Sequence, residues 1–117
     1  MWHVEATDEF AVWYDGLTDV QQEAVETAVA ALELGGPSLG RPFVDTLKAS
    51  RHSHMKELRP RGGNLRVAFA FDPRRYAILL LGGDKTGQWD EWYRDAIPVA
   101  DDLYDAHLDE LRREGLM

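Results

Sequence analysis

A carboxylate and two guanidinium groups lie close together in the sequence, in a pattern that places them on one side of a β-sheet. Side chains alternate between the two faces of a strand. A strand over 55–59 therefore puts Glu57 and Arg59 on the same face, and a second strand over 65–71 adds Arg66 to that face. Guanidinium groups stabilise the negative charge that develops on a phosphate during substitution. The three side chains together predict phosphodiester chemistry.

Cleavage by a ribose 2′-hydroxyl also needs a group that takes the hydroxyl proton. The sequence offers Glu57 and His54 for this step. A carboxylate between two guanidinium groups is also a common structural ion pair. The pattern alone leaves the catalytic and the structural explanation open.

Basic residues gather in the middle of an otherwise acidic chain. The net charge is −8, yet ten of the 13 Lys and Arg residues and only four of the 21 Asp and Glu residues lie between positions 41 and 85. The overall acidity opposes non-specific coating of a nucleic acid, whereas the basic segment permits a local phosphate site. The alternative is a set of solvated side chains that protect sheet edges. Further RNA contacts are predicted for His54, Lys56, Arg61, Arg74 and Arg75.

Two other patterns resemble ligand sites only superficially. Residues 82–87, GGDKTG, lack the Gly-Lys-Ser/Thr ending of a nucleotide-binding P-loop. Their glycines are instead predicted to let the chain turn sharply from a strand into a helix. His52 and His54 form a His-x-His pair with no third ligand close in the sequence, which favours exposed side chains over a metal site. No metal or cofactor is predicted.

The bulk properties limit the class of protein. The chain has 117 residues, which predicts one domain over 1–117 with a single core. It contains no cysteine, so disulfides, thiolate nucleophiles and cysteine metal sites are excluded. No apolar run approaches the roughly 20 residues of a membrane span, and the first ten residues do not have the pattern of a secretory signal. A cytoplasmic protein is the simplest expectation.

Two amphipathic helices are predicted near the N-terminus, after a short strand over 2–5. Thr7 or Asp8 can cap the first helix. Thr18 opens the second, and Gln21 three residues later completes the pattern of a capping box. The second helix ends at Gly-Gly-Pro. The two helices are predicted to form a helical hairpin with one apolar face.

Three strands are predicted at 55–59, 65–71 and 76–82, the last apolar on both faces and therefore inside the sheet. The bulky face of the middle strand is predicted to pack on the hairpin. The opposite face carries small residues, so we expect it to be shallow and open, with Arg66 rising from it.

A C-terminal helical segment from about residue 88 to 113 is predicted to be kinked or divided by Pro98. A run of carboxylates along it is expected to form a solvated face: Asp101, Asp102, Asp105, Asp109 and Glu110. The fold class is thus α+β: a small, mainly antiparallel sheet of three or four strands, an N-terminal helical hairpin and a C-terminal helical segment.

This order of elements resembles the RelE/ParE superfamily of toxins from type II toxin–antitoxin systems, and most closely its phage-derived, HigB-like branch. The resemblance covers nearly the whole chain. It rests on KELR at 56–59, LRVAF at 65–69 and LLLGGDK at 79–85, followed by a helix rich in Trp and Tyr.

The resemblance implies a cytoplasmic mRNA endoribonuclease that acts at the ribosome by 2′-hydroxyl attack on the adjacent phosphate. Arg59, Arg66 and Lys85 match basic positions of the family, with Glu57 as a further catalytic candidate. Tyr93 is a candidate for the tyrosine that the RelE branch carries near its C-terminus. The implied partners are mRNA, the ribosome and a cognate antitoxin of the helix-turn-helix type, through which the toxin contacts DNA indirectly; no membrane is involved.

Two other functions stay open at this point. The protein can be a non-catalytic module whose basic face binds an acidic segment of the antitoxin and which acts through an autoregulatory repressor complex. It can also inhibit DNA gyrase, as the ParE branch does. A toxin of this type requires no metal for its chemistry.

Overall fold

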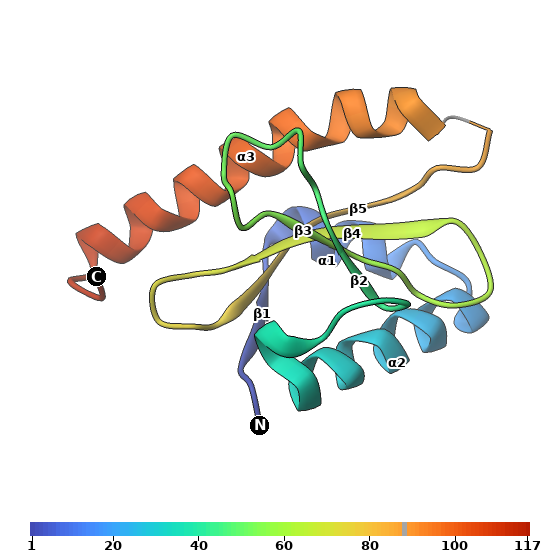
Figure 1. The fold of residues 1–117 in the computed structure, drawn as a ribbon, viewed down its shortest axis with the longest axis horizontal. Helices are drawn as coiled ribbons and strands as arrows, with labels where there is room; N and C mark the ends of the chain where they lie inside the picture. Colours follow the sequence, from blue (N-terminus) through green and yellow to red (C-terminus); the bar gives the residue numbers. More distant parts are fainter. Residues whose placement is uncertain (88) are drawn as a thin grey trace.

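The fold is a five-stranded sheet with helices on both of its faces (Figure 1). The structure, a computed structural model, describes residues 1–87 and 89–117. In chain order the elements are β1 (Val4–Ala6), α1 (Asp8–Asp15), α2 (Asp19–Gly35), the short 3-10 helix η1 (Gly36–Ser38), β2 (Val44–Thr46), β3 (Lys56–Leu58), β4 (Leu65–Phe71), β5 (Ala77–Asp84) and α3 (Trp89–Arg113). The predicted α+β class is confirmed.

The sheet has the strand order β1-β5-β4-β3-β2. Its strands pair antiparallel except at one edge, where β1 runs parallel to β5. The expectation of three or four strands was too low, because β2 is only three residues long and its sequence gave no clear period. The apolar strand β5 lies between β1 and β4, inside the sheet, as its composition predicted.

Both N-terminal helices begin where their capping residues predicted. The Thr7 side chain accepts a hydrogen bond from the Phe10 amide and caps α1. At the start of α2, Thr18 and Gln21 form the reciprocal capping box. The residue at which each helix begins is therefore set by contacts within its own first turn.

The helical hairpin packs on the bulky face of the sheet. Phe10 of α1 and three side chains of α2 join Leu65, Val67 and Phe69 of β4 in one buried cluster; the α2 members are Val25, Ala28 and Leu32. The tight packing confirms the predicted face.

The other face of the sheet is covered, contrary to the open surface that its small residues predicted. Helix α3 packs Ile97, Ala100 and Tyr104 onto Ala68 and Ala70 of β4. Figure 1 places α3 along the side of the sheet opposite to α2. The physical reason is that alanines leave room for a helix to approach the sheet closely.

Helix α3 runs through Pro98 as one element of 25 residues, not as two helices. Its carboxylates are not all solvated either. Asp101 is buried, and it accepts hydrogen bonds from the Ser50 hydroxyl and, at 3.2 Å, from the Arg51 amide. Asp101 therefore fastens the loop between β2 and β3 to α3. No helix within 1–87 and 89–117 is long and apolar enough to cross a membrane.

Two adjacent glycines inside β5 leave space for tryptophan rings on the two faces of the sheet. A side chain at Gly82 would overlap the Trp13 ring of α1, and one at Gly83 would overlap the Trp92 indole of α3. The glycines thus belong to the strand, which corrects the predicted sharp turn. They allow α1 and α3 to pack closely on β5.

Substituting Gly83 by alanine should therefore loosen the contact between α3 and the sheet. We expect a loss of about 1–3 kcal/mol in the free energy of unfolding, the range typical of an overfilled site. Gly63→Ala is the matched control, because no heavy atom lies within 4 Å of the position that its new methyl group would take. Denaturant unfolding of both variants measures the difference, and equal stability would contradict the packing role of Gly83.

Candidate active site

Four of the predicted residues meet under the N-terminal part of α3. In the β3–β4 register Glu57 lies opposite Ala68, on the same face as Arg66, and Arg66 lies opposite Gly83 of β5. The Glu57 carboxylate accepts a hydrogen bond from Arg59 Nε at 2.9 Å. Lys85 lies just beyond the end of β5. It is close enough for the charges of Glu57, Arg59 and Arg66 to shift its pKa. We call these four residues, with Tyr93, the charge cluster.

Tyr93 of α3 connects the lysine to the carboxylate. Its hydroxyl accepts a hydrogen bond from Lys85 Nζ at 3.0 Å and donates one to Glu57 Oε1 at 3.2 Å. Burial and the neighbouring Glu57 raise the pKa of Tyr93, so the phenol keeps its proton at neutral pH. The arrangement offers a path for a proton between Lys85, Tyr93 and Glu57.

Three of the four charged side chains of the cluster are held away from water. Glu57 is 2% exposed, Lys85 4% and Arg66 9%. Burial, followed by the positive charge of Arg66, lowers the pKa of Lys85. A buried cation beside other cations is unfavourable unless anionic groups compensate it. Three basic side chains around one carboxylate leave the cluster with an excess of positive charge, which suits an anion.

Among the residues that the structure describes, two buried polar atoms of the charge cluster have no hydrogen-bond partner: Glu57 Oε2 and Arg66 Nε. Arg66 does donate through Nη1 to the Leu65 carbonyl at 2.7 Å. Buried polar atoms are nearly always paired, and exceptions gather where function requires them. One free acceptor and one free donor in the same cluster indicate a site that is completed by another molecule.

The prediction that Arg66 stands on an uncovered surface is wrong. Arg66 and Glu57 lie beneath α3, while Arg59, with its side chain 29% exposed, reaches the solvent at the edge of the charge cluster. The sequence pattern placed the residues correctly on one face. It did not reveal that α3 closes over this face.

Two predicted RNA contacts near the charge cluster point elsewhere. Lys56 lies opposite Phe69 and therefore projects on the hairpin side of the sheet. His54 is exposed and lines a separate cavity with Tyr104 and Leu108. Its neighbour His52 faces Asp105, with Nε2 at 2.8 Å from the carboxylate. Neither His54 nor Lys56 joins Glu57.

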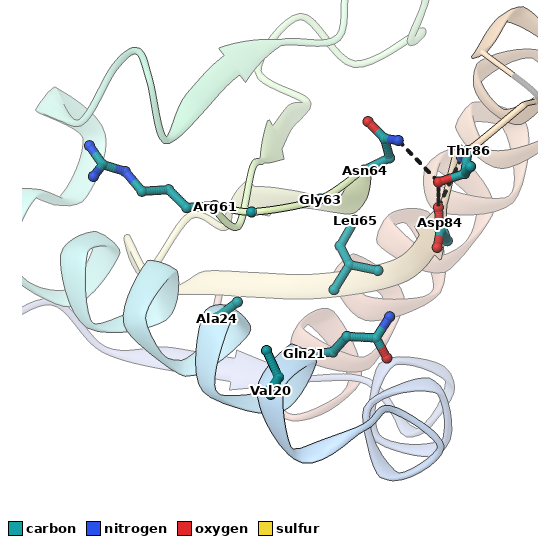
Figure 2. A pocket seen from close by; sticks show the side chains of 10 residues that line it. Val20, Gln21, Ala24, Arg61, Gly63, Asn64, Leu65, Asp84 and Thr86 are labelled. Atoms are coloured by element: carbon teal, nitrogen blue, oxygen red, sulfur yellow. Dashed lines mark hydrogen bonds between the residues drawn. The ribbon is translucent and has the colours of Figure 1, made fainter.

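Arg61 lies at the same end of the sheet but on the hairpin face. It lines a hollow of about 170 Å³ together with Asn64 and Thr86, and its guanidinium lies 5.3 Å from the centre of the Phe43 ring. Figure 2 shows Arg61 extending away from Asn64, whose amide donates to the Thr86 hydroxyl at 3.0 Å. Arg61 is thus available to a phosphate outside the charge cluster.

Arg74 and Arg75 lie in the turn between β4 and β5, at the opposite end of β4 from Arg66. Arg74 is engaged by Asp72 and by Glu5, each at 2.8 Å. Arg75 is exposed, and its guanidinium lies 5.5 Å from the centre of the Trp2 ring. Both are therefore remote from the charge cluster, and Arg74 has a structural role.

A second network, at the far end of α3, was not predicted from the sequence. The buried Asp72 carboxylate accepts from Arg74 and contacts His107 Nε2 at 2.9 Å, and these contacts hold the β4–β5 turn against α3. His107 lies 35 positions away in the sequence, and no local pattern relates it to Asp72. Among residues 1–87 and 89–117, no three His, Cys, Asp or Glu side chains are grouped to hold a metal ion.

Sequence comparison places the chain in a known family. The profile of the phage-derived Gp49-like proteins matches residues 12–105. HigB3 of Mycobacterium tuberculosis, whose name describes it as a toxin, is 52% identical over 89 residues, which cover 76% of this chain and 78% of that protein. HigB2 of the same organism, also named as a toxin, is 44% identical over 104 residues; this match covers 86% of this chain and 52% of HigB2, so the chain spans about half of that relative.

Comparison with solved structures shows that toxins of the RelE type share the fold of this chain. The isolated RelE toxin of E. coli has a TM-score of 0.59 at 9% identity, over 72% of this chain and 84% of that one. RelE in the RelB–RelE antitoxin–toxin complex of Methanococcus jannaschii has a TM-score of 0.57 at 8% identity, over 74% and 96%. The architecture is thus that of a RelE-like protein. The chain belongs to the phage-derived Gp49-like family and is a toxin of the HigB type in the RelE superfamily.

Proposed function

We propose that this toxin is an endoribonuclease that cleaves mRNA at the ribosome, with the charge cluster as its active site. The observation that carries the proposal is the meeting of Arg59, Arg66 and Lys85 around Glu57, with a free donor and a free acceptor among them. A positively charged site with unpaired polar atoms is better explained as a binding site for a phosphodiester than as an ion pair that only stabilises the fold.

In the proposed reaction the ribose 2′-oxygen attacks the adjacent phosphorus, and the bond to the 5′-oxygen of the next nucleotide breaks. Glu57 Oε2, which has no hydrogen-bond partner within the described part of the chain, accepts the 2′-hydroxyl proton. Arg66 and Arg59 stabilise the charge on the phosphate oxygens. Lys85, whose pKa is lowered by burial and by Arg66, supplies a proton to the leaving 5′-oxygen. The products are a 2′,3′-cyclic phosphate and a 5′-hydroxyl.

Substrate access requires α3 to move, because its N-terminal half covers Glu57 and Arg66. The half-exposed edge at Arg59 is the point where RNA first meets the charge cluster. Arg61, exposed at the same end of the sheet, is a candidate contact for a flanking phosphate; we assign no direct role to Arg74 or Arg75.

Tyr93→Phe tests the proton path. The change removes the hydroxyl that joins Lys85 and Glu57 and keeps the ring, which packs edge-on against Trp92. We expect RNA cleavage to fall by about 10- to 100-fold while stability changes by about 1 kcal/mol or less. Single-turnover cleavage and thermal unfolding of the same preparation measure the two effects. Unchanged cleavage would exclude Tyr93 from the chemistry.

The proposed cellular setting is the cytoplasm, with residues 1–117 acting as one toxin domain and with a cognate antitoxin as partner. The RelB–RelE complex supports such a partner for proteins of this fold; we expect an antitoxin of the helix-turn-helix type. Controlled expression followed by primer extension on cellular mRNA tests the activity. New 5′ ends inside coding regions are the expected result. Intact mRNA with broken chromosomal DNA would indicate a gyrase inhibitor, and intact mRNA and DNA would indicate a non-catalytic module.

A further inference from the structure

The N-terminal hairpin carries an acidic surface with an apolar groove that the proposed chemistry does not use. Residues 1–40 contain eight Asp and Glu residues and no Lys or Arg. A polyanionic substrate would be repelled by this part of the molecule. The hairpin also lies on the face of the sheet opposite to α3 and the charge cluster. It is therefore free to meet a different molecule.

The groove runs between α1 and α2 and has a volume of about 380 Å³. Phe10 and Tyr14 line it from α1, Val25 and Val29 line it from α2, and Leu79 of β5 also contributes. An apolar groove between two helices can accept the apolar side chains of an amphipathic segment.

Two carboxylates border the groove, Glu26 and Glu33 of α2. They are seven residues apart, so they lie on one side of the helix about 10 Å apart along its axis. Burial and the neighbouring Glu26 raise the pKa of Tyr14, whose ring also lines the groove. Within the described parts of the chain, neither Glu26 nor Glu33 is within ion-pair distance of a basic side chain.

Three exposed aliphatic side chains lie on the same two helices. Val12 is 74% exposed, Val20 78% and Leu34 76%, and apart from the terminal Met1 they are the most exposed large hydrophobic side chains among the described residues. Val20 lines a separate hollow with Arg61, on another side of α2 from the groove.

We propose that the hairpin groove is the docking site of the antitoxin, and that the antitoxin binds it with a basic amphipathic segment. This inference rests on the proposed partnership with an antitoxin. Apolar side chains of the segment fill the space between α1 and α2, and two Lys or Arg residues about two helical turns apart pair with Glu26 and Glu33. The segment need not enter the charge cluster, so antitoxin binding and RNA binding occupy opposite faces of the sheet.

Charge distinguishes this occupant from the others. A second copy of the chain related by two-fold symmetry would bring eight acidic residues against the same eight. An RNA strand would meet the same repulsion. A basic protein segment alone satisfies both the apolar floor and the acidic border.

The test uses the toxin variant Glu26→Lys/Glu33→Lys and, as its partner, the protein encoded by the reading frame adjacent to that of the toxin. The matched control is Asp109→Lys/Glu114→Lys, which changes the net charge equally on the exposed C-terminal end of α3. Titration calorimetry at two salt concentrations should show binding weakened at least about tenfold by the hairpin variant, with a smaller salt dependence, and little change for the control. Thermal unfolding confirms that both variants fold.

Equal binding by the two variants, or no binding by the unaltered toxin, would overturn the proposal. So would self-association of the unaltered toxin that the hairpin variant abolishes, because a second copy would then be the occupant. RNA cleavage by the hairpin variant should equal that of the unaltered toxin and should resist the antitoxin. Binding is measured without any activity assay, so a toxin that proves not to cleave RNA leaves this result interpretable.

Discussion

Arg66→Ala should abolish cleavage while leaving the fold intact. The Arg66 guanidinium is expected to stabilise the negative charge that develops on the phosphate in the transition state. Removing one such donor lowers the rate by about 100- to 1,000-fold. Arg66 is buried and donates through Nη1 to the Leu65 carbonyl, and its Nε has no hydrogen-bond partner among the described residues. Its removal also relieves the positive potential at Lys85. The fold therefore gains little from this charge.

The comparison needs two further variants. Arg66→Met keeps the packing of the aliphatic stem and guards against a cavity at this position. Arg112→Ala removes an arginine from an exposed pair with Asp109 and should have no effect. Growth after induction, and cleavage by purified protein in a translation reaction, are the measurements. Folded Arg66 variants that arrest growth as the unaltered toxin does would remove Arg66 from the active site.

Glu57→Gln should have the largest effect on stability. It leaves Arg59, Arg66 and Lys85 together without their shared carboxylate, and loss of one partner from a buried ionic network costs about 3–5 kcal/mol. Adding Lys85→Met should recover part of this loss, because it removes one positive charge from the charge cluster. Denaturant unfolding measures both variants. Asp45→Asn is the control: Asp45 lies 3.7 Å from Arg59 in a half-exposed position, and its loss should cost about 1 kcal/mol or less.

The loss caused by Glu57→Gln should depend on pH. The folded state lowers the pKa of Lys85 below its ordinary value of 10.5, so the charged lysine destabilises the fold at neutral pH. This penalty is present in full below the folded-state pKa and disappears as the pH rises toward 10.5. The difference between Glu57→Gln and the unaltered protein should therefore narrow at alkaline pH. If the difference in the free energy of unfolding is constant with pH, Lys85 is not the cation that destabilises the Glu57→Gln variant.

The sequence predicted the elements well where the signal was local. Thr7, Thr18 and Gln21 marked the helix starts, because capping contacts involve residues three positions apart. Alternation along two strands placed Glu57 and Arg66 on one face, and the register of β3 and β4 confirms it. The sequence pattern did not predict features that depend on contacts between segments far apart in the chain.

The closure of the site is the main example of such a failure. Ala68 and Ala70 were consistent with an open face, and only the position of Ile97 and Tyr104 in space shows that α3 fills it. The burial of Asp101 depends in the same way on the loop that carries Ser50. Local spacing fixes which residues share a face, but it does not specify what covers that face.

The most direct test of the central claim is cleavage of an mRNA with a single 2′-deoxynucleotide at the mapped cleavage site. If the charge cluster directs 2′-hydroxyl attack, the unmodified mRNA yields a 2′,3′-cyclic phosphate and a 5′-hydroxyl, and the modified mRNA stays intact at that position. Arg66→Ala should leave both intact. Cutting of the deoxy-substituted mRNA at the same rate, or products with a 5′-phosphate, would contradict this mechanism.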